Sequence, residues 1–123
     1  MRTIHHGETT DGRRFTVVGL YNKDQANEIK FGVAICGPQD NFARKVGRKI
    51  AEGRAVKNPT LVKELKIELP EDKEGFTHLS KLGYEVVETI AEDPYLYQEI
   101  LTKQHKEIED ERKQIKLKQQ NQV

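Results

Sequence analysis

Short apolar runs separated by polar turns occupy the first 37 residues and predict a three-stranded antiparallel meander. The pair Asp11-Gly12 is a strong hairpin signal, because a two-residue mirror-image turn needs positive φ at both central positions. The third run, EIKFGVAIC, is almost continuously apolar, which is typical of a strand covered on both faces. The predicted strands are residues 2–8, 14–21 and 28–36.

A helix is predicted over about residues 39–52, directly after the strand-breaking pair Gly37-Pro38. Its apolar positions recur every four residues, so we expect this face to pack on the sheet, and Gly53 to form a left-handed C-cap. The apolar positions are Phe42, Val46 and Ile50. The opposite face carries Arg44, Lys45, Arg48 and Lys49.

The second half of the chain is predicted to be mainly helical. Residues 65–69, LKIEL, alternate between apolar and polar side chains and indicate one further strand. A helix is predicted over residues 77–91, because apolar side chains line one side of it. These side chains are Leu79, Leu82, Val86, Val87 and Ile90. The pattern as a whole predicts an α+β fold: an N-terminal antiparallel meander with a packed helix, then a helical C-terminal part.

A last, long helix is predicted from Pro94 to about residue 118, because Asp93 can cap it and proline suits its first turn. Leu101, Ile108 and Ile115 recur every seven residues, which is half of a coiled-coil pattern. A helix this polar is stabilised mainly by packing its apolar stripe, along its own domain or against another chain. We therefore predict an α+β domain at 1–92 and an oligomerisation helix at 93–123, in a dimer or a higher homo-oligomer.

Composition narrows the class of protein. The chain has 123 residues, of which 35% are hydrophobic and 33% charged, so we expect one domain, or one domain with a solvated appendage. The net charge is only +1, so an affinity for nucleic acid has to come from a local patch. A single cysteine excludes an internal disulfide framework. The sequence shows no apolar run of about 20 residues and no signal-peptide pattern, so we expect a cytoplasmic protein without a membrane partner.

The helix predicted over residues 39–52 is the strongest candidate for a binding site. Residues 41–51 hold four bases and no acid, whereas the rest of the chain mixes its charges. Arg44 and Arg48 are one helical turn apart and can present two forked guanidinium groups to one phosphate. The free N–H groups at the start of such a helix also favour phosphate, although no P-loop pattern is present. The alternative interpretation is an ordinary solvated helix face.

Aromatic and basic side chains elsewhere extend this candidate site. Tyr95 opens the last helix, and an aromatic ring beside arginines can stack on a base, although packing at a helix junction is the alternative. Arg112 can reach the same ligand if the last helix folds back over the sheet, and ordinary charge pairing is the alternative. The candidate ligand-binding residues are Asn41, Arg44, Lys45, Arg48, Arg54, Lys57, Tyr95 and Arg112.

No constellation of residues predicts catalysis or a metal site. Adjacent residues of a strand point to opposite faces, so His5 and His6 cannot chelate one ion together. His78 and His105 lack partners at ligand spacing, and Cys36 ends an apolar strand, which favours burial over reactivity. The acidic runs are typical of solvated surface. We therefore expect a protein that is not an enzyme and needs no cofactor.

The meander at 2–36, the helix with the sequence FARKVGRKIAEGRA and the helix at 94–118 together resemble the Thoeris anti-defence sponges. These small phage proteins have an N-terminal antiparallel sheet and long C-terminal helices that pair between subunits. The resemblance implies a cytoplasmic protein of an infected bacterial host. It also implies that the protein sequesters a cyclic ADP-ribose-type signal or a cyclic oligonucleotide without degrading it.

Two other functions stay open at the level of sequence. The basic helix at 41–54 can lie along a phosphate backbone, in which case the protein is a nucleic-acid-binding regulator with a steep salt dependence. In the other case the C-terminal coiled helix binds a protein partner, the chain is a structural or adaptor protein, and the basic helix is a solvated face.

Overall fold

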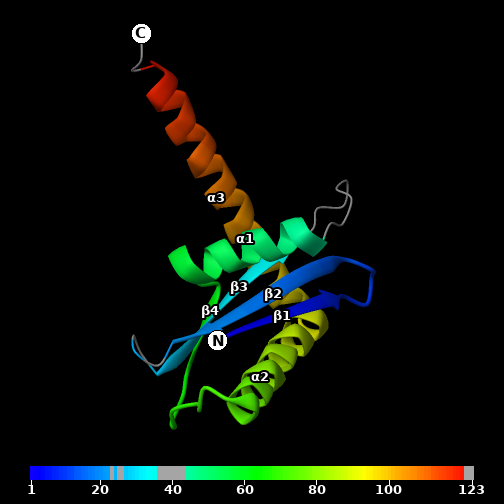
Figure 1. The fold of residues 1–123 in the computed structure, drawn as a ribbon. Coiled ribbons are helices and arrows are strands. Elements are labelled where there is room, and N and C mark those ends of the chain that lie inside the picture. The colour runs from blue at the N-terminus through cyan, green and yellow to red at the C-terminus, as the bar shows by residue number, and fades with distance from the viewer. Residues whose placement is uncertain (23, 25–26, 36–43, 121–123) are drawn as a thin grey trace.

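The computed structural model describes residues 1–22, 24, 27–35 and 44–120, and it has the predicted α+β architecture (Figure 1). The strands are β1 (Arg2–Glu8), β2 (Arg14–Tyr21), β3 (Glu28–Ile35) and β4 (Leu61–Glu64). The helices are α1 (Arg44–Lys57), α2 (Lys73–Glu92) and α3 (Pro94–Gln120). The three predicted N-terminal strands are confirmed over the described residues, and Cys36, the predicted end of the third strand, lies outside them. A turn at Asp11-Gly12 is confirmed, and Gly12 has a positive φ of 85°. The prediction of a two-residue turn with positive φ at both positions was wrong, because Asp11 has no positive φ and the loop spans residues 9–13.

The fourth strand lies earlier in the chain than the sequence pattern predicted. The sheet has the order β1-β2-β3-β4 with all neighbours antiparallel, and β4 is Leu61–Glu64, so the prediction of a strand at 65–69 was wrong. The reason is the length of β3. Its first residue, Glu28, pairs with Glu64, and a chain that continues past Glu64 has no residue of β3 left to pair with.

The sheet lies between two helical layers (Figure 1). Alternate residues of a strand face opposite sides, so Val17 and Val33 point to one layer and Val18 and Ala34 to the other. The first side holds the main core, which α2 and the first half of α3 complete. The second side is covered by α1, which packs on β2 and β3.

Helix α1 meets the sheet with its smallest side chains. A Cβ on Gly32 of β3 would lie 1.8 Å from the carbonyl oxygen of Ala51, so the backbones are in close contact. Only small residues fit there, and Ala51 and Ala55 are buried. The predicted packing of Val46 and Ile50 on the sheet was therefore wrong: their exposed fractions are 55% and 44%. Phe42 lies outside the described residues.

The helix is also longer at its C-terminal end than predicted. It continues through Gly53 to Lys57, and Gly53 does not adopt a positive φ, so the predicted C-cap at Gly53 was wrong. A Cβ on Gly53 would meet nothing within 4 Å, so this glycine is a tolerated residue of an exposed helix face. The predicted start near residue 39 lies outside the described residues.

The two C-terminal helices follow the predicted pattern with one shift. Helix α2 begins four residues earlier than predicted, because the Asp72 side chain accepts a hydrogen bond of 3.0 Å from the Gly75 N–H and caps the helix. Asp93 caps α3 by accepting from the N–H groups of Tyr95 and Leu96, as predicted. The predicted apolar side of α2 is confirmed: Leu79, Leu82 and Ile90 are buried, and Val86 and Val87 pack against the core.

Helix α3 changes its environment halfway along its length. Tyr97 and Ile100 are buried in the main core, whereas residues 108–119 are all exposed and extend away from the sheet (Figure 1). Ile108 and Ile115 of the predicted heptad stripe are among these exposed side chains. The division of the chain at residue 92 and the role of α3 in oligomerisation stay predictions.

Candidate functional site

The candidate site is the basic face of α1, which we define as Arg44, Lys45, Arg48 and Lys49. All four side chains are exposed. None of them has an acidic group within ion-pair distance among the residues that the structure describes. Four neighbouring cations without a counter-charge create a local positive potential on a protein of nearly zero net charge. The arrangement is suited to binding an anion.

His6 of β1 adds a titratable group beside the basic face. Its Nδ1 atom lies 3.0 Å from the Thr16 hydroxyl oxygen, and a Cβ on Gly47 of α1 would lie 2.8 Å from the same oxygen. Burial, together with the positive charges of Arg44 and Arg48, lowers the pKa of His6 below its ordinary value. His6 thus lies within the electrostatic field of the two arginines, at the border between α1 and the edge strand β1.

The predicted separation of the two histidines is confirmed. His6 faces the α1 side of the sheet, whereas His5 is buried on the α2 side, with its ring centroid 4.3 Å from that of Tyr84. The alternation along β1 predicts that the two histidines cannot share a metal ion, but by itself it does not place His6 beside the basic helix. The signal was present, because one of two adjacent strand residues must face a helix that covers that side of the sheet.

The ion pair between Glu52 and Arg2 lies at the C-terminal end of the row that Arg44 and Arg48 form on α1. Glu52 continues the row of Arg44 and Arg48 by one further turn, and its Oε1 atom lies 2.9 Å from Nη1 of Arg2 on β1. Within the described residues, the side of α1 that faces β1 therefore has two arginines without an acidic partner, followed by a neutralised pair. An anion is attracted to the Arg44–Arg48 end.

Arg54 has a different environment from the rest of the predicted site. Its Nη1 atom donates to the Val33 carbonyl and to Oε1 of Gln104, each at 2.9 Å, and its Nε atom lies 3.3 Å from Glu107. Its side chain is only 15% exposed. The Gln104 side chain also bonds to both the N–H and the C=O of Ile35. Arg54 and Gln104 thus occupy the free edge of β3, past the end of its pairing with β4, and join α1, the sheet and α3.

The remaining predicted residues do not join the Arg44–Arg48 end of the basic face. Lys57 lines a groove of about 670 Å³ between α1 and α3, together with Arg54, Lys49 of the basic face and acidic side chains of α3 such as Asp110. Tyr95 is 88% exposed in the first turn of α3, in the layer on the opposite side of the sheet from α1. Arg112 lies on the exposed half of α3, and Asn41 lies outside the described residues. The structure brings together Arg44, Lys45 and Arg48 and adds His6.

Other kinds of site find no support in the described part of the chain. There, no group of three or more histidine, cysteine, aspartate or glutamate side chains is arranged to hold a metal ion. None of the described helices combines the length and the hydrophobicity of a membrane span. Comparisons with protein-family models, curated proteins and solved structures found no match, so the candidate function depends on the site itself.

Proposed function

We propose that the protein binds a small phosphate-bearing nucleotide on the basic face of α1 and holds it without chemical change. The observation that carries the proposal is the pair Arg44 and Arg48, which are exposed, one turn apart and without an acidic partner among the described residues. Two guanidinium groups at this spacing match the geometry of a phosphate or pyrophosphate group.

The neighbouring groups have supporting roles in this proposal. Lys45 and Lys49 raise the local potential, and the exposed side chain of Val46 offers an apolar surface to a base or a ribose. His6 gains a proton more easily once a bound phosphate offsets the charges of Arg44 and Arg48. Binding an anion here orders exposed side chains, and the attraction between the phosphate and the cations has to offset this loss of entropy.

The biological role in this proposal is sequestration. The resemblance to Thoeris anti-defence sponges implies a ligand of the cyclic ADP-ribose type or a cyclic oligonucleotide. A protein that binds such a signal tightly lowers its free concentration and so counters the immune response of the host cell. Neither catalysis nor a cofactor is required, because tight binding alone removes the signal from its receptor.

The test is calorimetry with purified protein against ADP-ribose, cyclic ADP-ribose and a cyclic dinucleotide, followed by mass analysis of the recovered ligand. We expect at least one of them to bind and to be recovered intact. Arg44→Glu with Arg48→Glu should abolish binding and leave the circular dichroism unchanged. The matched control is Lys66→Glu with Lys81→Glu, which makes the same change in charge at two exposed lysines. Equal loss of binding in both double variants would exclude a specific site.

A second candidate function is supported by α3. Ile115 and Leu117 are more than half exposed on the part of this helix that extends from the sheet, as expected for a surface that binds a protein partner. In that case the pure protein binds no nucleotide and captures a partner that a variant with Ile115→Lys and Leu117→Lys does not. If the protein instead binds single- or double-stranded DNA with an affinity that falls steeply with salt, the basic face is a nucleic-acid surface.

A further inference from the structure

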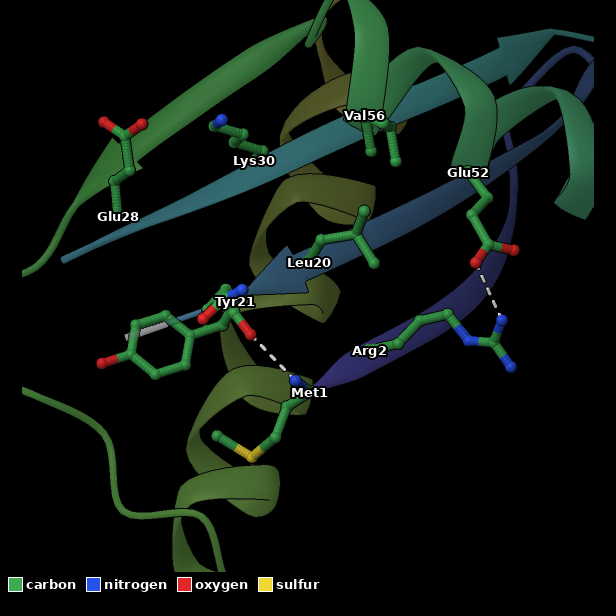
Figure 2. Close-up of a pocket in the computed structure, with 10 residues that line it drawn as sticks. Met1, Arg2, Leu20, Tyr21, Glu28, Lys30, Glu52 and Val56 are labelled. Carbon is green, nitrogen blue, oxygen red and sulfur yellow. Dashed lines mark hydrogen bonds and ion pairs between the residues drawn. The ribbon is translucent and has the colours of Figure 1, made fainter. Parts of the chain in front are cut away.

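A second groove lies on the α1 side of the sheet, beside the C-terminal half of α1 (Figure 2), and neither Arg44 nor Arg48 lines it. Its volume of about 680 Å³ falls within the range of small-molecule sites. The lining residues are Met1, Arg2, Leu20, Tyr21, Asn22, Glu28, Lys30, Glu52, Ala55 and Val56. None of the predicted site residues is among them.

The register of the sheet gives this groove an apolar centre. Arg2 is the Cα partner of Leu20, and Leu20 is the Cα partner of Lys30, so the three side chains form one row across β1, β2 and β3. Directly paired residues point to the same face of a sheet. Val56 of α1 points down toward Leu20 (Figure 2) and is 63% exposed, so the two side chains border an open apolar slot.

The two ends of the slot differ in charge. At the β1 end Arg2 and Glu52 neutralise each other in an ion pair of 2.9 Å. At the β3 end Glu28 and Lys30 are two residues apart on one strand and point to the same side (Figure 2). Both are half-buried, and neither has an ion pair or hydrogen bond within the described part of the chain.

Glu28 and Lys30 together determine which charges a ligand of this groove can carry. A ligand with a single negative charge that approaches Lys30 is repelled by Glu28, and a ligand with a single positive charge is repelled by Lys30. A group that carries one ammonium and one carboxylate side by side satisfies both residues. Glu64, the Cα partner of Glu28 on β4, adds further negative potential beside the position of the ammonium.

We propose that this groove binds a free α-amino acid with an apolar side chain. Its carboxylate pairs with Lys30, its ammonium pairs with Glu28, and its side chain lies between Leu20 and Val56. The Arg2–Glu52 pair closes the far end of the slot and limits the length of the side chain. This site is separate from the proposed nucleotide site and does not depend on it.

The experiment is a titration of the ¹⁵N-labelled full-length protein with L-leucine up to about 10 mM, followed by amide shifts, since a small ligand at a half-open site binds in the millimolar range. We expect saturable shifts at residues around Leu20, Lys30 and Val56. N-acetyl-leucine lacks the ammonium, leucinamide lacks the carboxylate and glycine lacks the side chain. Each of these probes should bind at least tenfold more weakly than leucine.

Variants separate this site from general effects. Lys30→Gln and Glu28→Gln should each weaken leucine binding at least tenfold, and Val56→Ser should weaken it severalfold. Lys81→Gln and Glu88→Gln are the matched controls and should leave it unchanged, because both residues are exposed and away from the groove. Absence of shifts with leucine, or equal binding of leucine and N-acetyl-leucine, would overturn the proposal.

Discussion

The carbonyl oxygen of Ala51 in α1 lies directly over Gly32 in β3, where a Cβ on Gly32 would approach it to 1.8 Å. The same Cβ would lie 2.5 Å from the Ala55 nitrogen, so it would clash with the helix backbone at two points. A backbone cannot move aside like the end of a flexible side chain. The contact therefore fixes the distance between the helix that carries the basic face and the sheet beneath it.

Replacement of this glycine should be costly. We expect Gly32→Ala to lower the free energy of unfolding by about 3 kcal/mol or more, because the helix has to separate from the sheet. The measurement is urea denaturation followed by circular dichroism. Gly53→Ala is the matched control, since its Cβ meets nothing within 4 Å and should stabilise the helix by about 0.5–1 kcal/mol. Equal effects of the two substitutions would contradict the close contact.

Loss of the Gln104 side chain should destabilise the junction of α3 with the sheet. Gln104→Ala removes the partners of the Ile35 N–H and C=O and one acceptor of Arg54. We expect a loss of about 1–3 kcal/mol in the free energy of unfolding, because polar groups at a half-buried edge lose their partners. Gln114→Ala, on the exposed half of α3, should change the stability by less than about 0.5 kcal/mol.

Stability should fall in mild acid because of His5. Burial, and to a smaller extent the charge of His6, lower the pKa of His5 in the folded protein. The unfolded chain takes up a proton near pH 6.5, before the folded protein does, so the free energy of unfolding should be highest above pH 6.5 and decline below it. His5→Gln should reduce this decline between pH 7 and pH 5, as measured by urea denaturation at each pH, and His6, whose pKa is also lowered, should account for the part that remains. An unchanged slope would show that His5 is not responsible.

Binding of an anion at the basic face should become tighter as the pH falls. Burial and the charges of Arg44 and Arg48 lower the pKa of His6 in the free protein, and a bound phosphate raises it again. Binding then takes up a proton, so affinity should rise from pH 7.5 to pH 6. Calorimetry with a ligand that contains only phosphodiester groups avoids titration of the ligand itself. His6→Gln should remove the pH dependence, and its persistence in this variant would place the titrating group elsewhere.

Shortening α3 at its exposed end should change the assembly of the protein without changing the stability of its fold. Among the described residues, a chain that ends after Glu111 loses only exposed side chains up to residue 119, so its thermal unfolding should match that of the full chain. If α3 joins subunits as predicted, light scattering should give a lower mass for the shortened protein at the same concentration. A chain that ends after Asp93 also loses Tyr97 and Ile100 from the core and should be strongly destabilised.

The meander was predictable because its signals are local. Asp11-Gly12 marks the position of the turn, although the loop is longer than the predicted two residues, and the β-branched and aromatic residues of RFTVVGLY favour a strand whatever surrounds them. The start of α3 was predictable for the same reason, because the signal at Asp93-Pro94 is also local. The position of β4 was not predictable in this way, because residues 65–69 alternate whereas residues 61–64 do not, and only the start of β3 decides which of the two segments has a partner.

The face of α1 that contacts the sheet could not be predicted from the residues of α1 alone. Val46 and Ile50 are its most apolar described residues in the N-terminal half, and an apolar stripe normally faces the core. Gly47, Ala51 and Ala55 form an equally regular stripe, but its use depends on Gly32 in a distant strand. The basic face was predictable from Arg44, Lys45 and Arg48, whereas the separation of Tyr95 and the burial of Arg54 follow from how the layers pack.

The contacts of Gln104 with Ile35 and Arg54 anchor the middle of α3, so among the described residues the second half of the helix is held only at one end. Glu107 of α3 also contacts Arg54 and Asn58, so the free arm begins at residue 108. With a rise of 1.5 Å per residue, the 12 residues 108–119 span about 18 Å, so a tilt of 10° at the junction moves the far end by about 3 Å. Because Gln104 holds Ile35 and Arg54 at the same point, force applied to the end of the helix is transmitted to the edge of the sheet and to α1.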